Sequence, residues 1–154
     1  QYEYAILILK KFLEEPDGWI ENKLNSCLVL SCCYQAMGEN AAAFDILFYS
    51  FTMDVPRAEI CCEIGRLFME KREYVTAAYW YQQALLAPRK KKNGGFYIAD
   101  SHDFIPAIQM CVCLDKAGRH REAFEFHKKV RVLKPLHQAV IGNEKYFRDV
   151  WGME

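Results

Sequence analysis

The sequence predicts an all-α chain in which three helical hairpins stack into a right-handed superhelix, with an extra N-terminal helix and a C-terminal capping helix. Similar residues recur 34 positions apart, a spacing typical of stacked helical hairpins, in the pairs Leu30 with Ile64, Tyr34 with Phe68, Ala43 with Ala77 and Leu47 with Tyr81. A third copy follows at an offset of 46 positions, in the pairs Ile64 with Met110, Phe68 with Leu114 and Ala77 with Ala123. The alternating strand and helix patterns of a parallel sheet are missing.

Apolar residues three and four positions apart, together with helix-breaking residues, indicate where each helix lies. We expect helices near 2–14, 22–37, 40–53, 57–71, 74–86, 104–117, 120–132 and 137–150. We predict that residues 1–154 form a single domain. Its parts are an extra helix at 1–15, repeats at about 24–55, 58–89 and 104–135, an inserted loop at about 89–101 and a cap at 137–151.

The N-terminal helix is apolar almost all round, and a helix of this kind is normally buried on both sides. We expect one face to pack on the first repeat. We expect the other face to contact a second copy of the chain, as in a homodimer, or an upstream domain. The residues assigned to this self-association or interdomain face are Ile6, Leu9, Phe12 and Leu13.

Small and helix-breaking residues recur at equivalent places in the three repeats. Ala43, Ala77 and Ala123 are placed where the two helices of a unit cross, and Pro56, Pro88 and Pro135 close the units. With the 34-residue period, these features resemble tetratricopeptide repeats, and the resemblance implies a surface that binds proteins or peptides. Cys27, Cys61 and Ala107 stand where the family usually has a large aromatic residue, which leaves the superhelical pitch open.

The third repeat is displaced by a dozen extra residues that fall in one loop. This loop contains the basic run from Arg89 to Lys92 and the turn signal Asn93-Gly94-Gly95. In the helix that follows, Pro106 should occupy the first turn, where its missing donor is harmless. Asp103 or Ser101 should cap that helix.

A narrower set of phrases covers almost the whole chain. These are Pro56-Arg57-Ala58-Glu59, Tyr79-Trp80-Tyr81, Gly95-Phe96, the run Ile108-Gln109-Met110-Cys111-Val112-Cys113-Leu114-Asp115, and Asn143 followed by Tyr146-Phe147. They resemble the C-terminal repeat region of bacterial family 2 glycosyltransferases, in which a nucleotide-sugar-dependent catalytic domain precedes the repeats. Because the chain starts at Gln1, we expect it to be a processed chain or a fragment of a longer protein.

The first helix of each repeat should present a stripe of residues to a concave groove. The residues expected to contact a protein or peptide partner there are Asn25, Gln35, Glu59, Arg66, Met69, Glu70, Ile105, Asp115 and Lys116. Their mixed polar and apolar character suits a peptide, a helix or a loop of a partner.

The seven cysteines are odd in number, form no C-x-x-C motif, and all fall in the first helix of a repeat. We therefore interpret them as reduced core thiols and expect no metal site. The segment from Asp100 to Asp103 precedes a helix, so we interpret it as a cap and not as a metal or acid–base site.

Composition and motifs argue against catalysis and nucleic-acid binding. Twenty basic and twenty acidic residues cancel, and the single basic run is interpreted as a solvated loop. The chain carries no nucleotide-binding, hydrolase or zinc-protease motif and no D-x-D of a glycosyltransferase. It also has no membrane-spanning stretch. We expect a cytoplasmic, non-catalytic interaction module without a cofactor: the repeat domain of a glycosyltransferase or, alternatively, a stand-alone peptide-binding adaptor.

Overall fold

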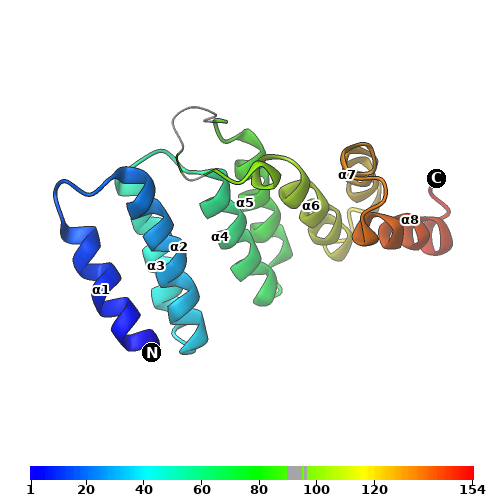
Figure 1. Cartoon of the computed structure of the whole chain (residues 1–154). Helices are drawn as coiled ribbons and strands as arrows, with labels where there is room; N and C mark the ends of the chain where they lie inside the picture. Colours follow the sequence, from blue (N-terminus) through cyan, green and yellow to red (C-terminus); the bar gives the residue numbers. More distant parts are fainter. Residues whose placement is uncertain (90–94, 96) are drawn as a thin grey trace.

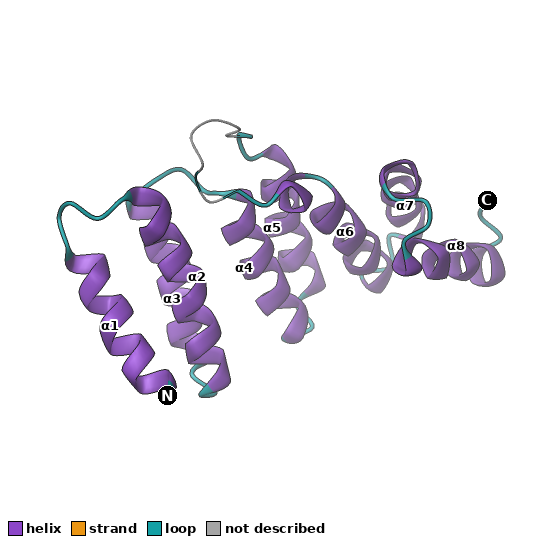
Figure 2. Ribbon diagram, in the orientation of Figure 1, coloured by secondary structure: helices purple, strands orange, loops and turns teal. Residues whose placement is uncertain are grey.

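The computed structural model in Figure 1 describes residues 1–89, 95 and 97–154. Within these residues the chain is an extended array of helices, and no strand occurs among them (Figure 2). The α-helices of the described residues are α1 (Tyr2–Glu14), α2 (Ile20–Ala36), α3 (Asn40–Tyr49), α4 (Ala58–Glu70), α5 (Tyr74–Leu86), α6 (Phe104–Lys116), α7 (His120–Leu133) and α8 (Gln138–Trp151). Two short 3-10 helices, η1 (Ser50–Thr52) and η2 (Ala99–His102), lie between them.

Three antiparallel hairpins, α2 with α3, α4 with α5 and α6 with α7, follow one another along the array, with α1 before them and α8 after them. The all-α repeat fold predicted from the sequence is therefore confirmed. The three alanines expected at the helix crossings, Ala43, Ala77 and Ala123, have no exposed surface. A Cβ built on Gly65 would lie 3.0 Å from ring carbons of Tyr81, which shows how closely α4 and α5 approach.

Each hairpin turns at a residue in the left-handed backbone region, at Gly38 (φ 77°), Arg72 (φ 60°) and Gly118 (φ 80°). After each of these residues, the next backbone N–H donates to a carbonyl of the preceding helix. The pairs are Glu39 to Tyr34 (2.8 Å), Glu73 to Phe68 (2.9 Å) and Arg119 to Leu114 (2.8 Å). These six residues keep the offsets of 34 and 46 found in the sequence, so the repeat register is also the register of the turns.

Two expected helices differ from the structure by two residues or more at one end. Helix α2 starts two residues earlier than expected, and α3 stops at Tyr49 and continues as the 3-10 helix η1. Ser50 donates a hydrogen bond through Oγ to the carbonyl of Leu47 (2.6 Å), and Thr52 donates through Oγ1 to that of Tyr49 (2.8 Å). These local bonds offer the carbonyls partners other than the next helical turn, which favours ending α3 there.

The assignment of Ile6, Leu9, Phe12 and Leu13 to an outer face of α1 is wrong. Leu13 is buried with Cys27 and Leu30, and Ile6 and Leu9 pack against the same cluster. The ring of Phe12 lies beside Gly18. The outer face instead carries Tyr4, Leu7 and Ile8. An almost uniformly apolar helix leaves its orientation to the neighbouring helix, and α2 selects the stripe formed by residues 6, 9 and 13.

The C-terminal helix packs through two residues seven positions apart. Val140 and Phe147 are buried, and the ring of Phe147 contacts those of Phe124 and His127 on α7. Val150 and Trp151 lie three and four residues after Phe147, on the same side of the helix, but both are exposed. Helix α8 therefore covers the last hairpin with fewer residues than expected and leaves much of its own surface open.

The described part of the insertion lies on α4. The carboxylate of Glu59 accepts a hydrogen bond from the backbone N–H of Ile98 (2.7 Å), and the thiol of Cys62 faces the carbonyl of Ser101 (3.4 Å). As expected, Asp103 caps α6 by accepting from the N–H of Phe104 (2.5 Å), and Pro106 is its third residue. Residues 90–94 and 96, which hold most of the basic run and the turn signal, lie outside the described residues.

Candidate partner-binding groove

One face of α4 shows how the insertion divides the predicted groove. Glu59, Cys62, Arg66 and Met69 follow one another at helical spacing, so they form a single stripe along α4. At the N-terminal end of the stripe, η2 and the residues before it cover Glu59 and Cys62. Only the C-terminal half of the stripe is open to solvent.

Glu59 is buried, at 5% exposure, so its assignment as a partner-contacting residue is wrong. Its carboxylate holds the backbone of Ile98 and lies 3.7 Å from the Nε2 atom of His102, which is also buried. The ring of Tyr97 stacks on that of His102, with centroids 4.7 Å apart. Glu59 thus anchors the inserted segment, because an ionised carboxylate in the interior needs hydrogen-bond partners.

A charged network occupies the open half of the stripe and joins α4 to α2. The carboxylate of Glu63 accepts two hydrogen bonds from Arg66, one from Nε (2.9 Å) and one from Nη2 (2.6 Å), and a third from Nε2 of Gln35 (3.0 Å). Arg66 also donates to Glu70 and to the amide oxygen of Gln35. The structure therefore brings three predicted groove residues, Gln35, Arg66 and Glu70, into direct contact.

Glu63 is the central acceptor of this network and was missed in the sequence. It lies three residues before Arg66 and seven before Glu70, so its position on the same face could be inferred from helical spacing. The side chain of Glu63 is 17% exposed and that of Arg66 is 41% exposed. An exposed guanidinium held in a fixed orientation by two carboxylates can donate to a backbone carbonyl of a partner with little further ordering.

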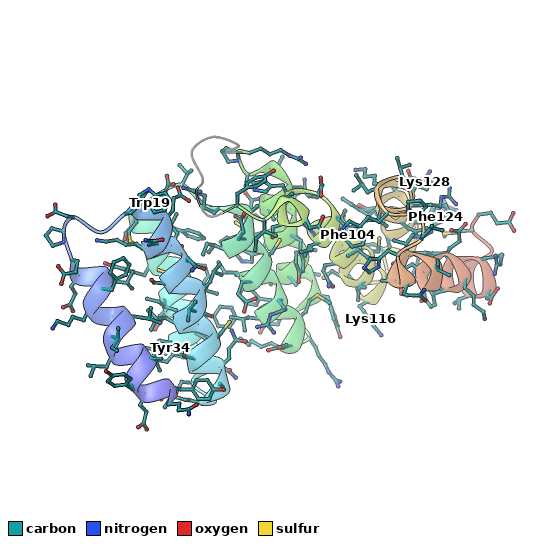
Figure 3. The ribbon with its side chains drawn as sticks, viewed as in Figure 1. Trp19, Tyr34, Phe104, Lys116, Phe124 and Lys128 are labelled. Atoms are coloured by element: carbon teal, nitrogen blue, oxygen red, sulfur yellow. The ribbon has the colours of Figure 1, made fainter. Side chains whose placement is uncertain are left out.

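A second polar group lies between α6 and α8. A pocket of about 180 Å³ is lined by Cys111, Val112, Asp115 and Lys116 from α6 and by Asn143, Tyr146 and Phe147 from α8. Lys116 is exposed at the end of α6, far from Phe104 at its start (Figure 3). Apolar walls with a few polar groups are typical of binding pockets.

A closed ring of contacts holds this pocket in shape. Asp115 lies 2.6 Å from Nδ1 of His120 and accepts a hydrogen bond from the hydroxyl of Tyr146 (2.7 Å). The hydroxyl in turn accepts from Nε1 of Trp151 (3.2 Å), whose ring stacks on that of His120 at 3.7 Å. These four side chains come from α6, α7 and α8, so they set the position of α8 beside α6. Hydrogen bonding to Asp115 raises the pKa of Tyr146 above its ordinary value and keeps the hydroxyl protonated.

The other predicted groove residues lie outside the two polar groups. Asn25 is exposed on α2. Met69 and Ile105 are half-buried against the hydrophobic core, and the hydroxyl of Tyr81 lies 3.5 Å from the sulfur of Met69. The helical spacing placed them on the correct face, but packing between neighbouring hairpins partly covers them. Tyr146 and His120 were not assigned to the groove, because α8 and α7 were expected to serve only as scaffold.

The cysteines lie where the sequence analysis expects them, three on α2 and two each on α4 and α6. All seven are free thiols, and only Cys32 is exposed. Burial raises the pKa of Cys27 to about 11 and that of Cys111 to about 12, so these thiols stay protonated at neutral pH. Among the residues that the structure describes, no group of three or more His, Cys, Asp or Glu side chains is arranged to bind a metal ion.

The polar segment before α6 has structural roles. Ser101 and His102 are buried, Asp103 caps α6 and pairs with Arg89 (3.1 Å), and Asp100 pairs with Lys134. These contacts agree with the capping interpretation of Asp103. Across the described ranges, every helix is too short or too polar to cross a membrane.

Comparison with known proteins identifies the fold alone. No protein-family model matches the chain, and no curated protein matches it. Among solved structures, the crystal structure of MamA superposes with a TM-score of 0.67, at 22% sequence identity, over 96% of this chain and 81% of MamA. The fold is therefore a tetratricopeptide-like helical repeat.

Proposed function

We propose that this chain is a non-catalytic protein-interaction module, acting as one domain over residues 1–154, that binds a polypeptide in the groove beside α2, α4, α6 and α8. The observation that carries the proposal is the oriented network around Arg66. Gln35 and Glu63 hold this guanidinium in place, yet 41% of its side chain remains open to solvent. A backbone carbonyl of a partner can use its free surface, because a neutral acceptor is not repelled by the carboxylates of Glu63 and Glu70 that already pair with Arg66.

The pocket between α6 and α8 supports the same function. Its apolar residues Val112 and Phe147 suit a side chain of the bound segment, and Lys116 and Asp115 offer opposite charges at the same place. A groove with both signs of charge favours a partner segment of mixed polarity over a nucleic acid, whose uniform negative charge needs an excess of basic residues.

Peptide selection tests the proposal. A random peptide library displayed on phage is panned against the chain, and the affinities of the selected peptides are measured by isothermal calorimetry. Reversing the charges of this pair, with Arg66→Glu and Glu70→Arg together, should lower the affinity of the selected peptides about tenfold or more, equivalent to about 1.4 kcal/mol. The matched control reverses an exposed pair on α7, with Glu125→Lys and Lys128→Glu, and should bind like the unchanged chain.

Two results would count against the groove. One is a library that yields no peptide, and the other is a set of peptides weakened equally by the α4 and the α7 reversals. Circular dichroism of each variant shows whether the fold is retained. The α7 pair is exposed and contributes at most about 1 kcal/mol to stability. The check matters more for the α4 reversal, because Arg66 also bonds Gln35 and Glu63.

The second candidate is narrower: the module is the C-terminal repeat region of a nucleotide-sugar-dependent glycosyltransferase and not a stand-alone adaptor. Its support is the set of sequence phrases, which includes the run from Ile108 to Asp115 along α6. The coding sequence upstream distinguishes the two forms. A catalytic α/β domain with a D-x-D motif supports the glycosyltransferase, and a coding sequence without one supports the adaptor.

A further inference from the structure

The zero net charge of the chain conceals a separation between its two halves. Residues 1–77 carry twelve acidic and seven basic side chains, whereas residues 78–154 carry eight acidic and thirteen basic ones. The first half is therefore negative by five charges and the second half positive by five. Three of the basic residues, Lys90 to Lys92, lie outside the described residues, so the described part of the second half is positive by two charges. Because the helices follow one another along an extended array (Figure 1), the charges beside each end decide how two chains can meet.

Both ends of the array also expose apolar side chains. At the N-terminal end, α1 presents Tyr4 (69% exposed), Leu7 (66%) and Ile8 (48%) on the face turned away from the first hairpin. Around the turn between α7 and α8, Val132 and Leu136 are more than 80% exposed. In a repeat array each hairpin is covered by its neighbours, so uncovered apolar surface is expected on α1. The second patch lies at the edge of the last hairpin, which α8 covers through Val140 and Phe147 but not at Val132 and Leu136.

The charges beside these apolar residues are complementary. Residues 1–18 contain four acidic and two basic side chains, a net charge of −2. Residues 121–137 contain five basic and two acidic ones, and the ion pairs of Arg131 with Glu144 and of Lys134 with Asp100 reduce this excess to one positive charge. If α1 of one chain paired with α1 of another, two N-terminal ends with a net charge of −2 each would meet, because Glu15 and Asp17 follow the electrically balanced helix. Contact between the N-terminal end of one chain and the α7–α8 turn of another joins opposite charges around two apolar patches.

The structure assigns to these two ends a role in self-association: α1 of one chain docks head to tail on the α7–α8 turn of a second copy. The two surfaces of this interface are different, so each bound chain still offers one free end, and longer linear assemblies form as the concentration rises. This interface lies outside the groove around Arg66 and does not depend on what the groove binds.

Two exposed positions separate this arrangement from its alternatives. Leu7→Arg places a positive charge against the basic rim, and Leu136→Glu places a negative charge against the acidic rim. Both side chains are largely exposed, so neither change disturbs the core. Val75→Arg on α5 is the matched control, because Val75 is 67% exposed, as Leu7 is, but lies in the middle of the array.

Sedimentation velocity over a range of concentrations gives the readout. The unchanged chain and Val75→Arg should form assemblies that grow with concentration and shrink at about 1 M salt, where the screening length falls to about 3 Å. Leu7→Arg alone and Leu136→Glu alone should be monomers. Mixed in equal amounts they should form a one-to-one dimer that grows no further, because one intact interface remains between them.

Several outcomes would overturn the proposal. An unchanged chain that stays monomeric at the highest concentration leaves no interface to explain. A Leu136→Glu variant that still dimerises, together with a mixture that forms no mixed dimer, would show pairing of α1 with α1 instead. Reversal of Arg66 and Glu70 must leave assembly intact; if it abolishes assembly, the groove and not the chain ends forms the contact.

Discussion

Replacing Arg72 by glycine should stabilise the folded chain, because Arg72 holds a left-handed backbone conformation (φ 60°) at a turn where the other two hairpins have glycine. A residue with a Cβ pays roughly 1–2 kcal/mol for this conformation. Glycine also makes the unfolded chain more flexible, which costs about 0.4–1 kcal/mol. The Arg72 side chain is exposed, so little packing is lost with it. The expected net gain in the free energy of unfolding is about 0.5–1 kcal/mol.

Urea denaturation followed by circular dichroism measures this change, and a gain of this size should raise the thermal midpoint by about 2 °C in a chain of this length. Arg72→Ala is the matched control, since it removes the same side chain but keeps the Cβ, and it should give no gain. Gly118→Ala at the equivalent turn reverses this balance and should destabilise by about 0.5–1 kcal/mol. If Arg72→Gly were neutral while Gly118→Ala was costly, the three turns would not be equivalent and the argument from register would fail.

The remaining predictions concern the core and the thiols. Gly65→Ala should lower the free energy of unfolding by about 1–3 kcal/mol, because its new methyl group would lie 3.0 Å from the ring of Tyr81. Gly142→Ala, whose methyl group would meet nothing within 4 Å, should raise it by about 0.5–1 kcal/mol in the same urea titration. Burial lowers the pKa of His127 below its ordinary value of 6.5, so stability should decline as the pH falls through 6.5 toward the lower folded-state pKa. In thermal melts at several pH values, the midpoint of His127→Leu should change less with pH than that of the unchanged chain. With a thiol reagent under native conditions, only the exposed Cys32 should react rapidly, and Cys32→Ser should abolish the fast phase.

Local patterns in the sequence were sufficient to predict the helices and the register of the repeats. The same offsets relate the alanines at 43, 77 and 123 and the turns at 38, 72 and 118. They recur because the two helices of each hairpin pack in the same way and need side chains of similar size at equivalent positions. The cap at Asp103 was predictable for a similar reason, because it depends on a hydrogen bond to the next residue. Interactions within one or two turns of helix leave a direct trace in the order of residues.

For the candidate site, the sequence could predict which side of each helix faces the groove but not which of those residues stay exposed. Helical spacing correctly placed Gln35, Arg66 and Glu70 on the groove side of their helices. It also placed Glu59 on that side, as a residue open to a partner. The segment that buries Glu59 comes from 39 residues further along the chain. Helical spacing also left undecided which side of α1 faces α2, and the residues expected on the outer face, such as Leu9 and Leu13, pack on α2 instead.

The sequence by itself therefore determined the fold class, the repeat register, the opposite charges of the two halves and the reduced state expected for the thiols. The tertiary structure alone decided which half of the α4 stripe stays open, how Tyr146 closes the pocket over Asp115, and which apolar residues of α1 remain uncovered. These outcomes depend on contacts between helices distant in the chain. Such contacts are selected by the fit of whole surfaces, and no short spacing of residue types encodes that fit.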